Sequence, residues 1–311
     1  MMKDGFSRVI DYARISITDG CNFSCHYCKV PEECAVSQLS GDQLKTLVDT
    51  LDQLKFRKLR FTGGEPLLHK NLVEVIDYAL KKQHIKDIGI TTNAFLLDDY
   101  LDPLVQAGLK RINISLDSLK KDRFHQITKV DKLEKVLENI VLARQKNLIV
   151  KVNVVLMKGV NDDEIPDFLA FGKRHDVQIR FIELMKIGKN GGFVKDKQFD
   201  LTAHFKAYKK QAKRPGCKDV TDYYIDEFGY VFGIISPLSN HFCATCNRIR
   251  FTSDGKLRLC LHGNHETDIK QHLNDEEALA KIIVECVNAK PDKHRMNEGE
   301  ITDRGMNRIG G

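Results

Sequence analysis

Residues 12–28 read YARISITDGCNFSCHYC, a polar–apolar alternation followed at once by three cysteines. The alternation over residues 12–18 predicts a β-strand. Cys21, Cys25 and Cys28 then lie in the loop that follows this strand. The segment therefore predicts the first strand of a sheet with a group of clustered thiols at its end.

The same strand pattern recurs up to about residue 185, with an amphipathic stretch after each strand. The further predicted strands are 58–62, 87–92, 111–117, 150–156 and 177–184. The predicted helices lie near residues 40–54, 70–83, 98–107, 131–146 and 164–174. Strands and helices that alternate at this spacing predict an α/β fold with a parallel sheet. Six strands, where a closed TIM barrel has eight, predict an incomplete (βα)6 TIM-like barrel.

Four of the inner strands have one apolar and one polar face. Helices must cover the apolar face, so we expect the polar residues to point inward. The apolar set is Leu59, Phe61, Ile88, Ile90, Ile112, Ile114, Val152 and Val154. The polar set is Lys58, Arg60, Thr62, Gly89, Thr91, Asn113, Ser115, Lys151 and Asn153. This pattern favours a wide polar cavity for an anionic ligand over a half-solvated open sheet.

The pattern changes after about residue 190. A weakly helical basic stretch (201–213), two hairpins (221–235 and 248–261), a helix near 274–288 and a polar tail ending in RGMNRIGG follow in that order. This composition predicts a smaller C-terminal module of hairpins and a helix. We expect two domains, residues 1–190 and 191–311.

Length and composition limit the class of protein. The 311 residues are 42% hydrophobic, which is enough for a substantial core, and no apolar run reaches the roughly 20 residues of a membrane helix. The beginning, MMKDGFSRVIDYA, lacks the apolar stretch of a signal peptide. We therefore expect a soluble, cytoplasmic protein. The net charge of +6 suits an anionic small ligand at least as well as a nucleic acid.

Nine cysteines are the unusual feature of the composition. In a reducing cytoplasm, clustered cysteines indicate metal or redox chemistry more often than disulfides. Six of them form two triads, and the other three have no partner spacing and no predicted role. The triads are Cys21, Cys25, Cys28 and Cys243, Cys246, Cys260; the remaining cysteines are Cys34, Cys217 and Cys286.

Each triad has two possible interpretations. Three thiolates can hold three irons of a cubane cluster and leave the fourth iron open, whereas an electron-transfer cluster takes four cysteines. Alternatively, His26 could complete a zinc knuckle with the first triad, and His262 a zinc ribbon with the second. Two incomplete triads in one chain favour two clusters, each with an open iron.

CNFSCHYC resembles the CxxxCxxC signature of radical S-adenosylmethionine enzymes, and FTGGEPLL at residues 61–68 resembles their glycine-rich motif. Gly63 and Gly64 let backbone groups approach closely, and Glu65-Pro66 stiffens the turn. The chain more closely resembles the GTP 3′,8-cyclase family of molybdenum cofactor biosynthesis. The motifs that carry this resemblance are RISIT, TGGEPLL, TTNA, ISLDS, KVNVVLMKG, IRFIELM, CATCNRIRFTSDGKLRLCL and the terminal Gly-Gly.

This resemblance implies a lyase with two [4Fe–4S] clusters that uses S-adenosylmethionine to convert GTP to (8S)-3′,8-cyclo-7,8-dihydroguanosine 5′-triphosphate. It assigns the cluster ligands to Cys21, Cys25, Cys28, Cys243, Cys246 and Cys260. It assigns cofactor contacts to Tyr27, Gly63, Gly64, Glu65, Ser115 and Met185. It assigns GTP contacts to Arg14, Arg60, Thr91, Lys151, Arg248, Ile249 and Arg250. The inward strand register adds Lys58 and Arg180 as further candidates. The resemblance assigns catalytic assistance to Arg248, Arg250, Arg304, Gly310 and Gly311.

Some positions depart from the family pattern. Gly20 stands where Arg is common, Lys29-Val30 stand where Met-Pro is usual, and the segment between Cys28 and the GGEP motif is short. These differences affect the loop that covers the first cluster.

Two other functions compete with this one: a twin-cluster radical enzyme that acts on a peptide or another nucleotide, and a zinc-ribbon protein that binds nucleic acid. The implied partners are GTP, a reductant protein or small reductant, and cyclic pyranopterin monophosphate synthase for the product, with no nucleic acid and no membrane. The sequence does not determine the oligomeric state, and a homodimer is one possibility.

Overall fold

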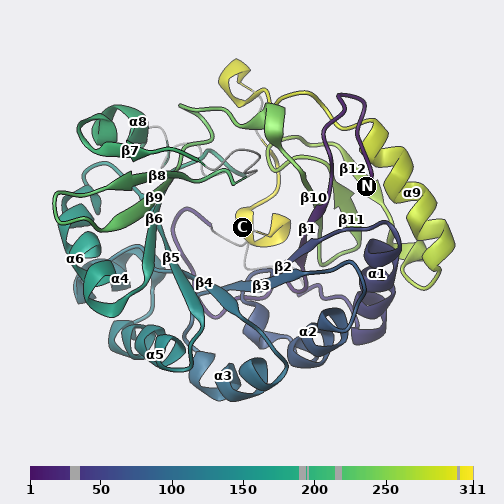
Figure 1. Cartoon of the computed structure of the whole chain (residues 1–311), viewed down its shortest axis with the longest axis horizontal. Helices are drawn as coiled ribbons and strands as arrows, with labels where there is room; N and C mark the ends of the chain where they lie inside the picture. Colours follow the sequence, from purple (N-terminus) through teal and green to yellow (C-terminus); the bar gives the residue numbers. More distant parts are fainter. Residues whose placement is uncertain (29–35, 189–193, 195, 214–218, 300–301, 311) are drawn as a thin grey trace.

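A computed structural model describes residues 1–28, 36–188, 194, 196–213, 219–299 and 302–310. Six parallel strands form the middle of a sheet that curves around the centre of the molecule (Figure 1). These strands are β1 (Tyr12–Ser16), β2 (Lys58–Thr62), β3 (Asp87–Thr92), β4 (Arg111–Ser115), β5 (Ile149–Leu156) and β6 (Gln178–Glu183). All six lie at the predicted positions, so the predicted parallel α/β sheet is confirmed.

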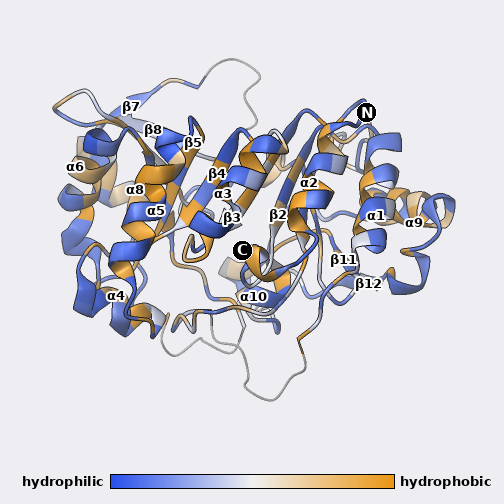
Figure 2. Ribbon diagram, turned by 90° about the horizontal axis from the view of Figure 1, so that it is seen from below, coloured by the Kyte–Doolittle hydropathy of each residue, from blue (hydrophilic) through white to orange (hydrophobic). Residues whose placement is uncertain are grey.

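The helices that connect these strands lie on the outer side of the sheet, where each turns an apolar stripe inward (Figures 1 and 2). They are α1 (Gly41–Gln53), α2 (Leu72–Leu80), α3 (Leu97–Gln106), α4 (Lys121–Thr128), α5 (Leu133–Gln145) and α6 (Ile165–His175). The first of them begins at Ser40, whose side chain and that of Gln43 form a capping box. The sequence pattern missed α4, because in this short helix the apolar side chains are only Phe124 and Ile127.

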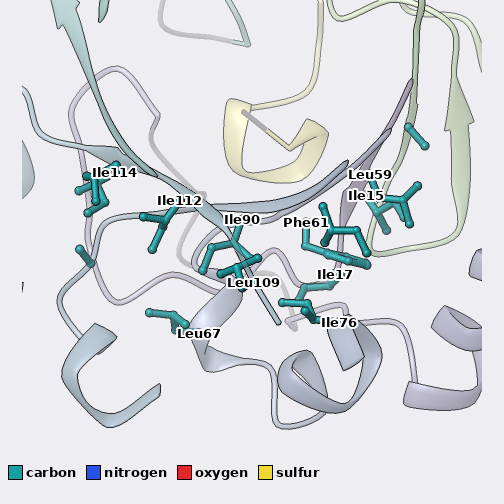
Figure 3. Packing of buried hydrophobic residues seen from close by; sticks show 14 of the residues in the cluster. Ile15, Ile17, Leu59, Phe61, Leu67, Ile76, Ile90, Leu109, Ile112 and Ile114 are labelled. Atoms are coloured by element: carbon teal, nitrogen blue, oxygen red, sulfur yellow. The ribbon is translucent and has the colours of Figure 1, made fainter. Parts of the chain in front are cut away.

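The core lies between the outer face of the sheet and these helices. Ile15, Phe61, Ile90 and Ile112 are fully buried on successive strands and face the helical layer, which includes Ile76 (Figure 3). The predicted apolar faces of the strands therefore pack as expected, and the polar faces are left to line the inside of the curve.

Both edges of the sheet are completed by the C-terminal segment. β10 (Arg248–Phe251) pairs in parallel with β1 and continues antiparallel into β11 (Lys256–Arg258) and β12 (Glu266–Asp268). At the other edge, β9 (Val231–Ile235) pairs in parallel with β6 and continues into β8 (Asp222–Ile225) and β7 (Lys209–Gln211). The two predicted hairpins thus extend one twelve-stranded sheet that is continuous across the expected boundary at residue 190.

The basic stretch 201–213 is only partly helical. Helix α8 ends at His204 after four residues (Leu201–His204), and residues 209–211 form strand β7. The prediction of a helix was wrong there, because pairing with β8 outweighs the weak helical preference of KKQ. Short 3-10 helices lie at Pro66–Leu68, Asp162–Glu164, Phe205–Ala207, Cys243–Thr245, Lys270–His272 and Met296–Glu298.

Helix α9 (Glu276–Asn288) lies at the predicted place and packs against α1. The tail then returns to the centre of the molecule, where it forms α10 (Met306–Ile309) inside the curve of the sheet (Figure 1). Within the described ranges, none of the helices combines the length and the apolar character that a membrane span requires.

Candidate active site

A cavity of about 400 Å³ lies inside the curve of the sheet, in the size range of small-molecule sites. Both cysteine triads line it, together with inward side chains of the central strands. The predicted polar cavity is therefore present, and it joins two cysteine groups that are more than 200 residues apart in the sequence.

The first triad lies in the loop after β1, and the GGEP segment holds this loop in place. The backbone N–H of Gly64 donates to the carbonyl of Thr18, and that of Glu65 donates to the carbonyl of Gly20, both at 2.8 Å. A side chain at Gly63 or Gly64 would collide with these same carbonyls. Both glycines also line the cavity. The two glycines thus let the GGEP backbone lie directly against the triad loop and also form part of the cavity wall.

The thiols of the first triad are buried enough to suit a metal cluster. Burial raises the pKa of Cys21 to about 12 and that of Cys28 to about 11. The backbone N–H of Asn307 donates to Cys28 and opposes this rise. In the metal-free protein these thiols are therefore protonated at neutral pH, and binding a metal would release their protons.

The spacing of the thiols distinguishes a cluster from a single zinc ion. Around one tetrahedral zinc, thiolate sulfurs lie roughly 4 Å apart. Among the described residues, the one group of His, Cys, Asp or Glu side chains arranged to hold a single ion is His241, Cys243 and His294, whose ligand atoms lie within 4.8 Å of one another. Neither cysteine triad forms such a group. Thiolates on three different irons of a cubane are farther apart, so both triads fit a cluster better than zinc.

The loop of the second triad is fixed by Arg8. Its guanidinium donates to the carbonyl of Cys243 at 2.8 Å and to the carbonyl of Asp292 at 2.7 Å. Arg8 also pairs at 2.6 Å with the buried carboxylate of Asp4. This buried ion pair ties the N-terminus, the triad loop and the segment after α9 together, and so positions the second group of thiols.

Three arginines lie in one row across three neighbouring strands. Arg14 on β1 is in register with Arg250 on β10 on one side and with Arg60 on β2 on the other. Like charges directly opposite on paired strands are destabilising. Burial lowers the pKa of Arg250 well below its ordinary value, and Arg14 and Arg248 lower it further. Such a row is unfavourable unless an anion lies over it.

Further cations continue this row around the cavity. Burial is the main cause that lowers the pKa of Lys151 to about 8, and the charge of Arg180 is the second cause. Burial also lowers the pKa of Arg180 to about 10. Buried guanidinium nitrogens of Arg60, Arg180 and Arg248 have no hydrogen-bond partner among the described residues. Buried donors of this kind are costly unless they are satisfied, and several cationic ones together fit a polyanionic ligand.

Comparison with known proteins agrees with this geometry. Residues 15–172 match the radical SAM superfamily, and residues 177–296 match the family described as Molybdenum Cofactor Synthesis C. The chain is 40% identical to a protein of Listeria welshimeri named GTP 3′,8-cyclase, over 100% of this chain and 99% of that protein. It is 41% identical to a protein of the same name from Alkaliphilus oremlandii, over the full length of both.

The chain belongs to the GTP 3′,8-cyclase family. A solved structure of Streptococcus suis SuiB bound to S-adenosylmethionine has the same fold, with a TM-score of 0.65 at 12% identity over 91% of this chain and 66% of that one. The family membership and the shared fold confirm the resemblance found in the motifs.

Nearly all the residues that the family resemblance assigns to the cofactor line the cavity. They are Tyr27, Gly63, Gly64, Ser115 and Met185. Glu65 instead lies buried behind the wall, where it accepts hydrogen bonds from the Thr92 hydroxyl at 2.6 Å and the Asn93 backbone N–H at 2.7 Å. Burial raises the pKa of this carboxyl to about 7.

All but one of the residues assigned to GTP also line the cavity: Arg14, Lys58, Arg60, Thr91, Lys151, Arg180, Arg248 and Arg250. Ile249 is the exception. It alternates with its two arginine neighbours on β10, and its side chain is fully buried in the hydrophobic core. The Ile249 side chain therefore points away from the cavity, which leaves only its backbone to contact GTP.

The tail residues assigned to catalysis occupy two different places. The carbonyl of Gly310 accepts a hydrogen bond from Arg250. Arg304, in contrast, is paired with Asp254 through two hydrogen bonds of 2.9 and 2.8 Å and with Glu266 at 2.8 Å. Arg304 is not among the residues that line the cavity, and its ion pairs hold the tail. Gly311 lies outside the described residues, as do Cys34, Cys217 and Lys29-Val30.

The sequence reasoning missed several polar residues of the cavity wall. Asp117 accepts a 2.6 Å hydrogen bond from the Tyr27 hydroxyl, and burial raises the pKa of Asp117 to about 6. Asn307 donates from its side chain to the carbonyl of Asp19 at 3.2 Å, and its Oδ1 is buried with no partner in the described chain. Asp117 lies within the ISLDS motif, which was the available signal, whereas Asn307 lies in a tail with no strand or helix periodicity.

Proposed function

We propose that this chain is a GTP 3′,8-cyclase that converts GTP to (8S)-3′,8-cyclo-7,8-dihydroguanosine 5′-triphosphate in molybdenum cofactor biosynthesis. The observation that carries the proposal is the row Arg250–Arg14–Arg60, which lies in one cavity with two cysteine triads. The row supplies positive charge for a triphosphate between the two groups of thiols. The curated relatives with this name support the same activity.

The residues present fit two iron–sulfur clusters. Cys21, Cys25 and Cys28 would hold the first one, next to S-adenosylmethionine, and the second triad would hold the other on the side of the base. When bound, the reduced first cluster supplies the electron that cleaves S-adenosylmethionine to a 5′-deoxyadenosyl radical. Tyr27, fixed by Asp117, and the glycines of the GGEP segment shape the wall around that cofactor.

The triphosphate would lie over the cations of the inner strands. A charge-assisted hydrogen bond contributes about 1.5–3 kcal/mol, so four or five of them supply the ~8 kcal/mol of a micromolar complex after ordering costs. The residues that would provide them are Arg14, Lys58, Arg60, Lys151 and Arg180, with Thr91 beside them. Satisfying the unpaired guanidinium nitrogens adds to the free energy of binding.

At the other end of the nucleotide, β10 would hold the base and ribose. Arg248 and Arg250 alternate onto the cavity side of this strand, beyond the second triad. Arg250 is already oriented by the carbonyl of Gly310, so the tail would hold this arginine in place beside the bound nucleotide. Figure 1 shows α10 inside the curve of the sheet, where the tail would limit the access of water to a bound nucleotide.

The wider context of the reaction follows from the same assignment. Electrons come from a reductant protein or a small reductant, and the product passes to cyclic pyranopterin monophosphate synthase. We propose that the enzyme acts in the cytoplasm and binds neither nucleic acid nor a membrane. The boundary between the barrel and the cluster module falls at residues 190–191.

The proposal is tested by reconstituting the full chain anaerobically and incubating it with S-adenosylmethionine, a reductant and one nucleotide. We expect the cyclo-dihydro product of GTP by mass spectrometry, and none from ATP. Efficient cofactor cleavage with no nucleotide product would instead support a twin-cluster enzyme for another substrate. A colourless protein that contains zinc would support the nucleic-acid-binding alternative.

A further inference from the structure

We propose that His262 is a displaceable fourth protein ligand of the second cluster. In this inference, which rests on the proposed function, the imidazole occupies the open iron when GTP is absent, and the guanine base replaces it when GTP binds. The three thiolates of the second triad would stay bound throughout, while the fourth ligand alternates between imidazole and guanine. None of the roles derived above for the cavity uses His262.

The first support is the position of the side chain. His262 follows Cys260 by two residues and lines the cavity together with Cys243 and Cys246. It is only 5% exposed, and its Nδ1 is buried with no hydrogen-bond partner among the described residues. Buried ring nitrogens of histidine are normally satisfied, by a hydrogen bond or by a metal. An unsatisfied nitrogen in the wall beside three thiols points to a metal ligand.

The second support is the way the neighbours hold the ring. The His262 and His294 rings lie edge to face, with centroids 4.9 Å apart. Arg258, which is 1% exposed, donates to the carbonyl of Gly263 and, at 2.9 Å, to the hydroxyl of Thr302. The loop after Cys260 is thus fixed on both sides of His262. A ring held in this way loses little conformational entropy when it binds iron.

The ligand exchange is balanced, since one nitrogen–iron bond breaks while one bond from the base to the same iron forms. No electron is transferred.

A metal site of another kind lies close by and has to be distinguished. The ligand atoms of His241, Cys243 and His294 lie within 4.8 Å of one another, which is close enough for one ion. His241 Nδ1 and His294 Nε2 are 2.9 Å apart, and His294 Nε2 also donates to the carbonyl of Pro237 at 3.1 Å. Because those two rings already share hydrogen bonds, we assign the cluster ligand to His262, whose Nδ1 has no such partner in the described chain.

The test is pulsed electron paramagnetic resonance of the reduced holoenzyme with 15N-labelled histidine and with S-adenosylmethionine present. We expect a 15N coupling of the size of a directly bound imidazole when GTP is absent, and its loss when GTP is added. The His262→Phe variant should lack the coupling, whereas His265→Phe, at an exposed histidine three residues further on, should keep it.

Isothermal titration with GTP gives a second readout. If the histidine-bound state predominates by ten to one, its removal in His262→Phe or His262→Gln should tighten GTP binding about tenfold. The absence of 15N coupling in the wild-type holoenzyme, or a coupling that survives in both His262 variants, overturns the proposal. Failure of the proposed function is separate from these outcomes, because it would appear as absent GTP binding or as a missing second cluster in the iron count.

Discussion

The guanidinium of Arg250 donates a hydrogen bond to the carbonyl of Gly310, sixty residues further along the chain. Arg250 belongs to the arginine row of the sheet, and Gly310 is the second-last residue of the sequence. The tail is thereby attached to the cationic wall of the cavity. On its other side, Asn307 reaches the first triad through the carbonyl of Asp19 and the thiol of Cys28. The tail therefore links the two ends of the site.

Deletion of Gly310 and Gly311 should abolish turnover and leave both clusters in place, because the deleted residues contribute no metal ligand. Gly310→Ala should have a similar effect, since Gly310 has a φ of +78° and its added Cβ would meet Thr62 at 2.7 Å. The measurement is product formation beside iron and sulfide content. Full activity in the truncated chain would refute a role for the tail in the reaction.

Arg14→Ala and Arg60→Ala should each weaken GTP binding by about 10- to 150-fold, the equivalent of one charge-assisted hydrogen bond of roughly 1.5–3 kcal/mol. The matched control is Arg57→Ala, at an exposed arginine just before β2. Calorimetric titration of the anaerobic protein gives the affinities, and absorbance of the clusters verifies their integrity. Unchanged GTP affinity in the two cavity variants would show that the triphosphate does not bind to the arginine row.

GTP affinity should fall about tenfold between pH 7.5 and pH 9. The pKa of Lys151 is lowered to about 8, so its charge, which favours the triphosphate, is present below that pH and is lost as the pH rises through it. The charged groups near it are Arg180, Asp219, Arg111 and Lys58. Arg180 and Asp219 keep their charges over this range, with pKa values of about 10 and about 2.

Lys151→Arg provides the control for this pH effect, because a guanidinium stays charged up to pH 9. Its GTP affinity should be nearly flat over the same range. Binding to the wild-type protein near pH 8.5 should also take up a fraction of a proton, which calorimetry in two buffers of different ionisation enthalpy detects. An equally steep decline in Lys151→Arg would show that another group titrates.

Cys260→Ser should lower the iron content from about eight to about four atoms per chain and weaken GTP binding, while S-adenosylmethionine still binds. The matched control is Cys286→Ser. Cys286 is half-buried on α9 and lies 3.2 Å from the Thr267 hydroxyl, away from the cavity. A loss of iron in the control, or none in Cys260→Ser, would contradict the assignment of the second triad.

The central strands of the fold were predictable because their pattern is local. Strand β5, for example, alternates buried Val150, Val152 and Val154 with the half-buried polar residues Lys151 and Asn153. The two C-terminal hairpins were predicted as well, but their pairing with β1 and β6 was not, because that pairing is long-range. Arg248–Phe251 has four residues and finds its partner β1 about 235 positions earlier, which no local periodicity records.

The site shows the same division. The alternation of β2 was enough to predict that Lys58 and Arg60 point inward. Neither periodicity nor spacing could place Arg304, because its ion pairs with Asp254 and Glu266 depend on a hairpin that is remote in sequence. The unsatisfied nitrogen of His262 likewise becomes visible only when the burial of the assembled cavity is known.

In the proposed reaction, this cavity brings the 5′ carbon of the cleaved cofactor to the ribose of GTP. The most direct measurement uses GTP deuterated at the ribose 3′ carbon, with mass analysis of the 5′-deoxyadenosine formed. We predict that 5′-deoxyadenosine appears only when GTP is present and that it carries the deuterium. Cofactor cleavage indifferent to GTP, or 5′-deoxyadenosine without deuterium, would contradict it.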